Sequence, residues 1–259
     1  MNNRFTMPDS SLSNAIYWYD FNYGSVHTIM MSSEHNITVG SPQYTFLEDS
    51  LKNVDRSVTP WVIVEMHRPM YNNEAYLSDY EVAVGMQGEF EDLLVQYVRE
   101  RSENIHFVLI YSSLSHSHQP SFTLISLHSY ILCAFTRACP TPINPLSRSF
   151  ACTHARFARR YDVDLVMAGH YHSYLRTSRV YKDKRDEEKG IYHMTVGSAG
   201  ASLDETTLYE KDWLEKFSME FGIARISVVN STHMHWEYIE NKDNGNTGAV
   251  VDETWIVKR

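Results

Sequence analysis

Two short runs of apolar residues constrain the fold of this chain more than any other feature of its sequence. The first run is Trp61–Val64, and the second is Val163–Ala168, which is interrupted only by Asp164. Continuous apolar runs of this length are typical of parallel strands that are buried on both faces of a sheet. Parallel strands need a long connection, usually through a helix, so the two runs predict an α/β fold.

Other segments fit this fold class. Ser41-Pro42 predicts the start of an amphipathic helix over 43–54, because serine caps helices well and proline is favoured in the first turn. A second helix is expected over Gly88–Tyr97. Further strands are expected in two places, a pair at the start of the chain and a group that we predict to form an antiparallel sheet near its end: Ile16–Tyr23, Val26–Met31, Tyr192–Val196, Ala224–Val229 and His233–Ile239.

One segment differs in composition from the rest of the chain. The 58 residues from Asn104 to Tyr161 contain no Asp, Glu or Lys, whereas the remainder holds all 32 acidic residues. At that density about nine acidic residues would be expected in the segment. Its apolar residues follow neither a helical nor a strand period for long. We therefore predict that residues 102–161 are an insertion without fixed structure, either retained intron sequence or a genuine addition, and that residues 1–101 and 162–259 form the folded domain.

All three cysteines lie in this segment, at Cys133, Cys139 and Cys152. Together with His154 they have the spacing CX5CX12CXH, which lacks the closely spaced cysteine pair of zinc knuckles. Unpaired thiols are the better interpretation.

The charge balance narrows the class of partner. The chain has 32 acidic and 23 basic residues, a net charge of -9, and no basic stripe. We expect no nucleic-acid partner, because such proteins cluster Lys and Arg against phosphates. A small phosphate ester remains open as a ligand, since metal ions can neutralise it. No apolar run is long enough to span a membrane, and Met1–Phe5 predicts no signal peptide.

Histidines follow both apolar runs. Val64-Glu65-Met66 is followed by His67, and Gly169 is followed by His170-Tyr171-His172. Neighbouring parallel strands deliver ligands at the carboxyl edge of their sheet, where we expect these three side chains to meet. Imidazole binds zinc, iron and manganese, and a His-X-His on an extended segment sends both rings to one side. The pattern predicts a metal site made by His67, His170 and His172.

Around these histidines the sequence resembles the purple acid phosphatases of the calcineurin-like metallophosphoesterase superfamily. The resemblance covers roughly residues 3–98 and 162–257, and so it brackets the charge-poor segment. It is carried mainly by four blocks: Tyr17–Gly24, Val64–Tyr71, Ala168–Tyr174 and Val196–Ala201. It implies the carboxyl-terminal half of a β-sandwich flanked by helices, an α/β/β/α arrangement whose amino-terminal half is missing.

The resemblance also implies a reaction and a metal centre. Members of the family hydrolyse phosphate monoesters at a dinuclear centre of Fe(III) with Fe(II), Zn(II) or Mn(II), held by seven ligands. By resemblance, His67 and His170 bind the divalent metal and His172 binds the ferric ion. The other four ligands are two Asp, a Tyr and an Asn. Their motifs, Gly-Asp-X-Gly, Gly-Asp-X-X-Tyr and Gly-Asn-His-Glu, do not occur here, and we expect them upstream of this sequence.

Two hypotheses follow for the function of this chain. In the first, it is part of an acid phosphatase that acts on small phosphate esters, with a homodimer as an open alternative to a monomer. In the second, it is a truncated, non-catalytic product that binds at most one metal ion through the three histidines. Asn36-Ile37-Thr38 and Asn230-Ser231-Thr232 are glycosylation sequons, which agree with the secreted, extracellular or vacuolar location that the family implies.

Overall fold

A computed structural model describes residue 7 and the ranges 16–74, 77–95, 97–98, 159–204, 208–241 and 247–259. All described elements belong to one compact unit made of residues 1–98 and 159–259. The expected insertion therefore lies outside the described residues apart from Arg159–Tyr161, and it remains a prediction.

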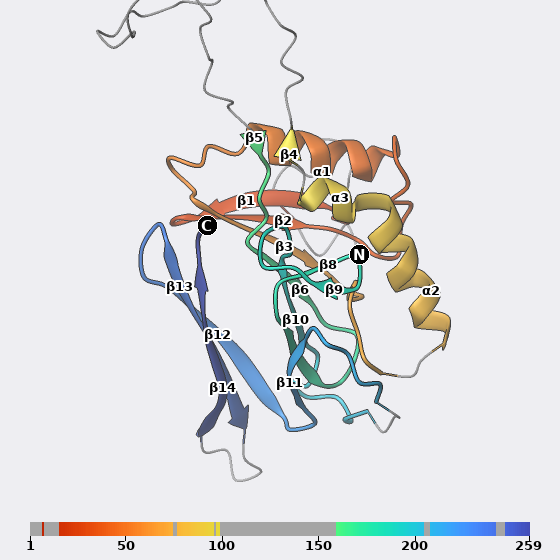
Figure 1. Ribbon diagram of the computed structural model, residues 1–259, viewed down its shortest axis with the longest axis vertical. Helices are drawn as coiled ribbons and strands as arrows, with labels where there is room; N and C mark the ends of the chain where they lie inside the picture. The colour runs from red at the N-terminus through yellow and green to blue at the C-terminus, as the bar shows by residue number, and fades with distance from the viewer. Residues whose placement is uncertain are drawn as a thin grey trace, which may run out of the picture. The chain divides into compact units, whose positions relative to one another are not determined.

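A mixed seven-stranded sheet is the centre of this unit (Figure 1). Its strand order is β1-β2-β3-β6-β10-β7-β11. Strands β2, β3, β6 and β10 are parallel to one another, and β1, β7 and β11 are added in antiparallel pairings. The strands are β1 (Tyr19–Tyr23), β2 (Val26–Met30), β3 (Trp61–Met66), β6 (Leu165–Ala168), β7 (Tyr174–Thr177), β10 (Tyr192–Val196) and β11 (Leu214–Ser218).

A second sheet contains three antiparallel strands in the order β12-β13-β14. They are β12 (Gly222–Val228), β13 (His233–Asn241) and β14 (Thr247–Val257). Two further pairs are only two residues long on each side: β4 (Tyr97–Val98) with β5 (Arg159–Arg160), and β8 (Val180–Tyr181) with β9 (Lys184–Arg185). The pairing of β4 with β5 places Val98 opposite Arg159.

The helices are α1 (Pro42–Asn53), α2 (Leu77–Met86), the π-helical turn η1 (Gln87–Glu91) and α3 (Asp92–Leu94). Helix α1 begins where the sequence predicts, because the Ser41 hydroxyl accepts a hydrogen bond from the Tyr44 amide at 3.2 Å. None of the helices in the described ranges is long and apolar enough to cross a membrane.

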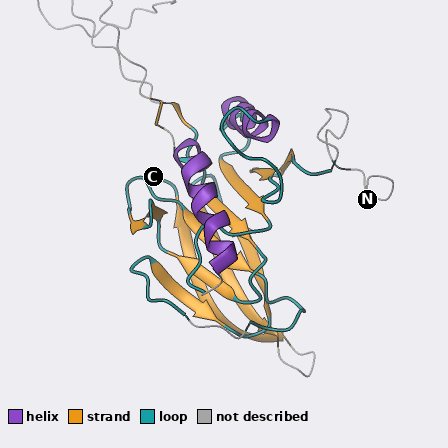
Figure 2. Ribbon diagram, turned by 90° about the vertical axis from the view of Figure 1, so that its right-hand side faces the viewer, coloured by secondary structure: helices purple, strands orange, loops and turns teal. Residues whose placement is uncertain are grey.

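Strand β3 is buried on both faces, as its apolar run predicts. Val62 and Val64 pack into a cluster with the helices, including Leu47 of α1 and Phe90 of η1. Trp61 and Ile63 point the other way and pack against Trp236 and Tyr238 of β13. The large sheet is thus covered by helices on one face and by the small sheet on the other (Figure 2).

The described residues therefore form three layers, helices on sheet on sheet. The mixed α/β class is confirmed, but a helical layer on the outer face of the small sheet, the fourth layer of the expected α/β/β/α arrangement, is not found in the described part of the chain.

Two sequence expectations are wrong in detail. Helical structure runs from Leu77 to Leu94 rather than from Gly88 to Tyr97, which lies in β4. Within it, Met86, Phe90, Leu93 and Leu94 recur at helical spacing and are all buried. Strand β10 does not join the carboxyl-terminal antiparallel sheet. It pairs in parallel with β6 in the large sheet, where His193, Met194 and Thr195 are all buried.

The last three residues of the expected insertion, Arg159–Tyr161, belong to the described unit. Tyr161 ends the charge-poor stretch and so falls within the predicted insertion, but its side chain is buried in the cluster beneath the helices. Arg56 donates hydrogen bonds to the backbone carbonyls of Tyr161 and Asp162. The folded part of the chain therefore includes Tyr161.

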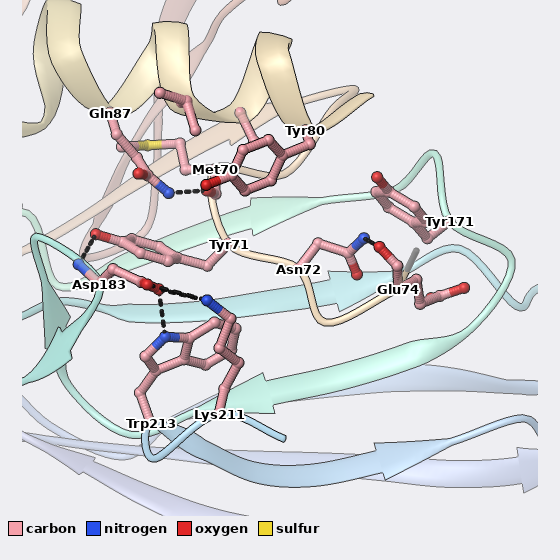
Figure 3. A pocket seen from close by; sticks show the side chains of 12 residues that line it. Met70, Tyr71, Asn72, Glu74, Tyr80, Gln87, Tyr171, Asp183, Lys211 and Trp213 are labelled. Carbon is pink, nitrogen blue, oxygen red and sulfur yellow. Dashed lines mark hydrogen bonds and ion pairs between the residues drawn. The ribbon is translucent and has the colours of Figure 1, made fainter. Parts of the chain in front are cut away.

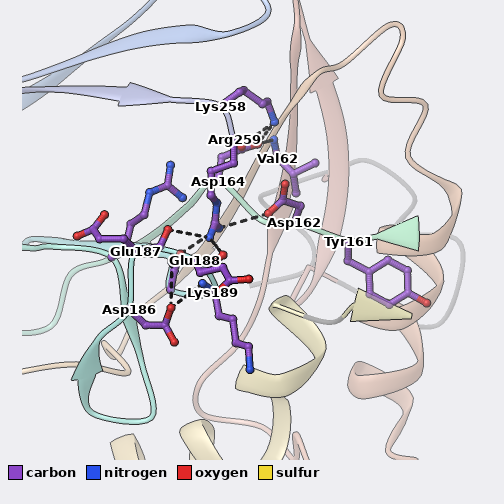
Figure 4. Close-up of polar contacts among 12 residues, drawn as sticks. Val62, Tyr161, Asp162, Asp164, Asp186, Glu187, Glu188, Lys189, Lys258 and Arg259 are labelled. Atoms are coloured by element: carbon purple, nitrogen blue, oxygen red, sulfur yellow. Dashed lines mark hydrogen bonds and ion pairs between the residues drawn. The ribbon is translucent and has the colours of Figure 1, made fainter. Parts of the chain in front are cut away.

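A buried carboxylate ties the start of β6 to the end of the chain (Figure 4). Asp164 Oδ2 accepts hydrogen bonds from the Val62 amide at 2.8 Å and from Arg56 Nη1 at 3.2 Å. Lys258 Nζ lies 2.6 Å from Asp164 Oδ1. Two cations and one amide thus surround a side chain that is only 7% exposed. The carboxylate is fully paired, which burial of a charge requires.

We expect Asp164→Asn to lower the free energy of unfolding by about 3 kcal/mol, because it leaves Arg56 and Lys258 half-buried without a counter-charge. Urea denaturation followed by circular dichroism measures the change. Asp162→Asn is the matched control: its carboxylate pairs with Arg259 at 3.4 Å at a more exposed position, so its cost should stay below about 1 kcal/mol. Equal costs for the two variants would contradict the role given to Asp164.

Candidate metal centre

Strands β3 and β6 end at the same edge of the large sheet. Their pairing runs in register to Met66 opposite Ala168, and the Gly169 amide then donates a hydrogen bond to the His67 carbonyl at 3.1 Å. The two side chains that follow meet: His67 Nε2 lies 3.0 Å from His170 Nδ1, and the ring centroids are 4.8 Å apart. The structure therefore brings two of the three expected histidines together.

His170 has an unusual backbone conformation. Its φ is +67°, and the Tyr171 amide donates to the Gly169 carbonyl at 2.8 Å, so His170 is the central residue of a γ-turn with positive φ. Turns of this kind are rare and strained for a residue with a side chain. The strain turns the chain sharply after β6 and directs the imidazole toward His67.

Charged side chains surround this pair. His170 Nε2 lies 3.1 Å from Asp79 Oδ2, and Arg68 Nη1 hydrogen bonds to Asp79 Oδ1. Arg68 Nε also donates to Glu34 Oε1 at 2.7 Å, and this hydrogen bond is the main reason that the pKa of Glu34 is lowered. Burial and the neighbouring His170 lower the pKa of His67, which favours the neutral ring that binds metals.

The third histidine is held separately. His172 Nδ1 lies 2.6 Å from the Ser202 carbonyl oxygen, and the His172 amide donates to Asp204 Oδ2 at 2.7 Å. Among the described contacts, the His172 ring bonds to neither His67 nor His170. Across the described ranges, no three His, Cys, Asp or Glu side chains are grouped closely enough to hold a metal ion. The three-histidine site therefore remains a prediction.

The donor atoms nevertheless suit a transition metal. Two imidazole nitrogens bound to one tetrahedral zinc ion at about 2.0–2.1 Å lie roughly 3.3 Å apart, close to the 3.0 Å between His67 Nε2 and His170 Nδ1. Metal-binding histidines usually donate their other ring N–H to an oxygen. Asp79 and the Ser202 carbonyl occupy that position for His170 and His172. The residues present fit the cation that the resemblance implies.

A glycine holds the loop that joins β6 to β7, Gly169–Ser173, here called the histidine loop, against the sheet. A Cβ atom at Gly197 would lie 1.8 Å from the Tyr171 carbonyl oxygen, so no other residue fits there without moving the backbone. The Gly197 amide donates to the Ser173 carbonyl at 3.0 Å. This contact explains why a glycine follows β10 at this point.

A pocket of about 220 Å³ lies beside the histidine loop, between α2 and the sheet (Figure 3). Tyr171, which separates His170 from His172, forms one end of it together with Glu74. At the other end, Asp183 accepts hydrogen bonds from Trp213 Nε1 at 2.7 Å and from Lys211 Nζ at 2.9 Å.

Glu74 is a buried carboxyl group at this pocket. Ser173 Oγ donates to its Oε1 at 2.5 Å, whereas Oε2 is buried without a hydrogen-bond partner in the part of the chain that is described. Burial raises the pKa of Glu74 to about 7, and the nearby Asp204 carboxylate adds to the rise. Nothing in the sequence signals this residue, or Asp79 and Arg68, because their partners lie far along the chain.

Both predicted glycosylation sequons lie in exposed turns. Asn36 Oδ1 accepts a hydrogen bond from the Thr38 amide at 3.0 Å, and Asn230 Oδ1 accepts one from the Thr232 amide at 2.8 Å. The two sites are accessible, and their modification remains a prediction.

A layered α/β protein with paired imidazoles at the carboxyl edge of its sheet is typical of metal-binding enzymes, and comparison with known proteins narrows this class. Residues 190–253 match the family described as "Iron/zinc purple acid phosphatase-like protein C". The chain is 30% identical over 261 residues to "Probable purple acid phosphatase 20" of Arabidopsis thaliana, covering 98% of this chain and 45% of the relative. It is 24% identical over 279 residues to "Acid phosphatase type 7" of Homo sapiens, covering 98% of this chain and 48% of the relative.

Among solved structures, the fold is similar to that of a purple acid phosphatase from yellow lupin seeds, with a TM-score of 0.65 and 21% identity. That match covers 99% of this chain and 35% of the lupin chain. These likenesses support, at the level of the family, the resemblance to purple acid phosphatases seen in the sequence. The chain spans a little under half the length of the curated relatives named above.

We expect the stability contributed by Glu74 to depend on pH. Its pKa is raised in the folded state, so the folded protein keeps a proton that the unfolded chain loses above its ordinary pKa near 4.5. The stabilisation is present below about pH 4.5 and is lost as the pH rises to about 7. At pH 8 the free energy of unfolding of Glu74→Gln, measured by urea denaturation, should therefore exceed that of the wild type by about 1–3 kcal/mol. The advantage should shrink toward pH 5, and a constant difference would refute the assignment.

The strain at His170 predicts that glycine is more stable than alanine at this position, the reverse of the usual order. His170→Gly should be more stable than His170→Ala by about 1 kcal/mol, because glycine adopts positive φ without steric cost. At His172, which is not among the positive-φ residues, the alanine variant should be the more stable of the two. Thermal unfolding of the four variants measures both differences. The same order at both positions would show that the γ-turn at His170 carries no strain.

Proposed function

We propose that this chain contributes part of the metal centre of a purple acid phosphatase-type hydrolase, which acts on small phosphate monoesters. The observation that carries the proposal is the 3.0 Å approach of His67 Nε2 to His170 Nδ1 at the ends of two parallel strands. The likeness of the chain to acid phosphatases over 98% of its length supports the choice of reaction.

In this proposal, His67 and His170 would bind the divalent metal through Nε2 and Nδ1, and His172 would bind the ferric ion through the ring nitrogen that does not contact Ser202. A bound metal pair supplies positive charge that polarises the phosphate ester and lowers the pKa of water. The chain's own residues orient these donors. Asp79 and the Ser202 carbonyl hold the outer nitrogens of His170 and His172, and Arg68 adds a positive charge beside the centre.

Three histidines do not complete a dinuclear centre, which needs a bridging carboxylate between its two ions. We propose that the two Asp, the Tyr and the Asn of the family pattern come from a polypeptide segment outside this sequence, as the carboxyl-terminal-half interpretation requires. The exposed sequons at Asn36 and Asn230 support a secreted, extracellular or vacuolar location for the whole protein. A homodimer stays open as its assembly.

We expect the 259-residue chain to bind zinc without turning over substrate. Isothermal titration should give one zinc ion per chain, and His67→Ala or His170→Ala should weaken the binding at least about tenfold, because each removes one of two converging donors. The chain should not hydrolyse p-nitrophenyl phosphate with iron and zinc or manganese added, because it lacks the bridging carboxylate. His233→Ala, at an exposed position on β13, is the matched control and should leave zinc binding unchanged.

Three outcomes would change this proposal. Rapid hydrolysis that is lost in His67→Ala would mean that other carboxylates of this chain, or of a second copy, complete the centre. Absence of zinc binding in the wild-type chain would remove the metal site itself. Zinc binding by a chain that stays inactive even when joined to the missing ligand blocks would favour the non-catalytic, single-metal hypothesis.

A further inference from the structure

We infer that Asp79 is a positioning residue of the candidate metal centre: it keeps a proton on His170 Nε2, so that the lone pair of Nδ1 faces the point shared with His67. The inference rests on the proposed function, because it gives that lone pair a cation to bind. Asp79 belongs neither to the histidine-bearing strands nor to the histidine loop. It lies in the first turn of α2.

The shorter of the two side-chain contacts at His170 Nε2, to Asp79 rather than to Arg68, assigns the ring proton of His170 to that nitrogen. An ionised carboxylate only accepts hydrogen bonds, and Asp79 Oδ2 lies 3.1 Å from His170 Nε2. That contact requires a proton on Nε2, and in the neutral ring it leaves the lone pair on Nδ1. His67 Nε2–H then donates to Nδ1 across 3.0 Å in the metal-free protein.

Arg68 makes the role of Asp79 specific. Its Nη1 lies 3.3 Å from the same His170 Nε2, and a guanidinium only donates hydrogen bonds. Without the carboxylate, Arg68 would donate to Nε2, and the ring proton would move to Nδ1. A donor instead of a lone pair would then face the cation. Asp79 prevents this rearrangement because its Oδ1 binds Arg68 while its Oδ2 binds His170.

The carboxylate is well placed to hold this arrangement. The Asp79 side chain is 17% exposed, and its partner Arg68 is fixed from the other side by Glu34 at 2.7 Å and by Ser33 Oγ, which accepts from the Arg68 amide at 3.0 Å. An acidic residue is also favoured in the first turn of a helix by the helix dipole. Asp79 and Arg68 therefore converge on the outer nitrogen of His170 from two separate segments, and Glu34 and Ser33, from a third segment, hold Arg68.

The test measures the tautomer of His170 directly, in the metal-free chain labelled with ¹⁵N-histidine. The His170 ring signals are identified among the 13 histidines by their loss in His170→Gly. We expect the Nε2–H form in the wild type and the Nδ1–H form in Asp79→Asn, in which the amide oxygen faces Arg68 and the amide nitrogen donates to His170. Glu81→Gln, an exposed position on the same helix, is the matched control and should keep the Nε2–H form.

Zinc titration supplies the second measurement. Asp79→Asn should raise the Kd for zinc about 10- to 100-fold, as the loss of an oxygen partner behind a metal-binding histidine usually does. In a His170→Ala background the same substitution should change the Kd less than about twofold, because Asp79 acts through His170. An Nδ1–H form in the wild type, or an unchanged Kd in Asp79→Asn, would overturn the inference.

The two measurements separate this inference from the proposed function. If the wild-type chain binds no zinc, the proposed function fails, but the metal-free spectrum still decides whether Asp79 fixes the His170 tautomer. If zinc binding needs His67 and His170 yet is indifferent to Asp79, the metal site stands and the inference fails. If Asp79→Asn does not fold, the wild-type spectrum alone decides the question: the Nε2–H form supports the inference, and the Nδ1–H form overturns it.

Discussion

The parallel pairing of β3 with β6 is the contact on which the candidate site depends. Its register is fixed at both ends. At the start, the Asp164 amide donates to the Val62 carbonyl at 2.9 Å while the Asp164 carboxylate accepts from the Val62 amide at 2.8 Å. At the finish, the Gly169 amide bonds to the His67 carbonyl. A slip of one residue would turn every side chain of a strand to the opposite face, so this register decides both what is buried and where His67 and His170 emerge.

The charged side chains at the two ends of the β3–β6 pair differ in their burial and in their partners. At the amino end, Asp164 is buried and its charge is balanced by Arg56 and Lys258, which makes the group structural. At the carboxyl end, Asp79 and Arg68 are partly exposed, and each also contacts His170. A buried ion pair whose polar atoms are all hydrogen bonded within the protein cannot bind a ligand. An ion pair that also hydrogen bonds to a histidine can set the orientation and protonation of that ring.

The apolar pattern of the sequence predicts most of the strands that surround the site. Strands β3, β6 and β13 and helix α1 are found close to where the pattern places them. The parallel direction of β3 and β6 also predicts that His67 and His170 lie near each other, as they do. The pattern assigns β10 to the wrong sheet, because a short strand buried on both faces has no preferred partner in its sequence. It does not reveal Asp79, Arg68 and Glu74, because their roles depend on contacts between distant segments. The pattern predicts that His172 lies near the other two histidines, but it does not predict that the His172 ring forms a hydrogen bond with the Ser202 carbonyl.

The two converging rings are held by different means, and this difference bears on how a metal ion would enter. His170 is constrained twice, by a backbone turn with φ +67° and by a carboxylate behind its ring. His67 follows directly from a regular strand, and among the described contacts its ring nitrogen Nε2 bonds to His170. The orientation of His170 is therefore fixed during folding. To bind a cation through Nε2, His67 would have to give up its hydrogen bond to His170 Nδ1 and carry its ring proton on its own Nδ1 instead. In the proposed metal site, His170 would be the ligand whose orientation is fixed before the ion binds, and His67 would be the ligand that rearranges. The geometry of the site then depends on the strained residue and its distant acidic partner more than on the regular strand before His67.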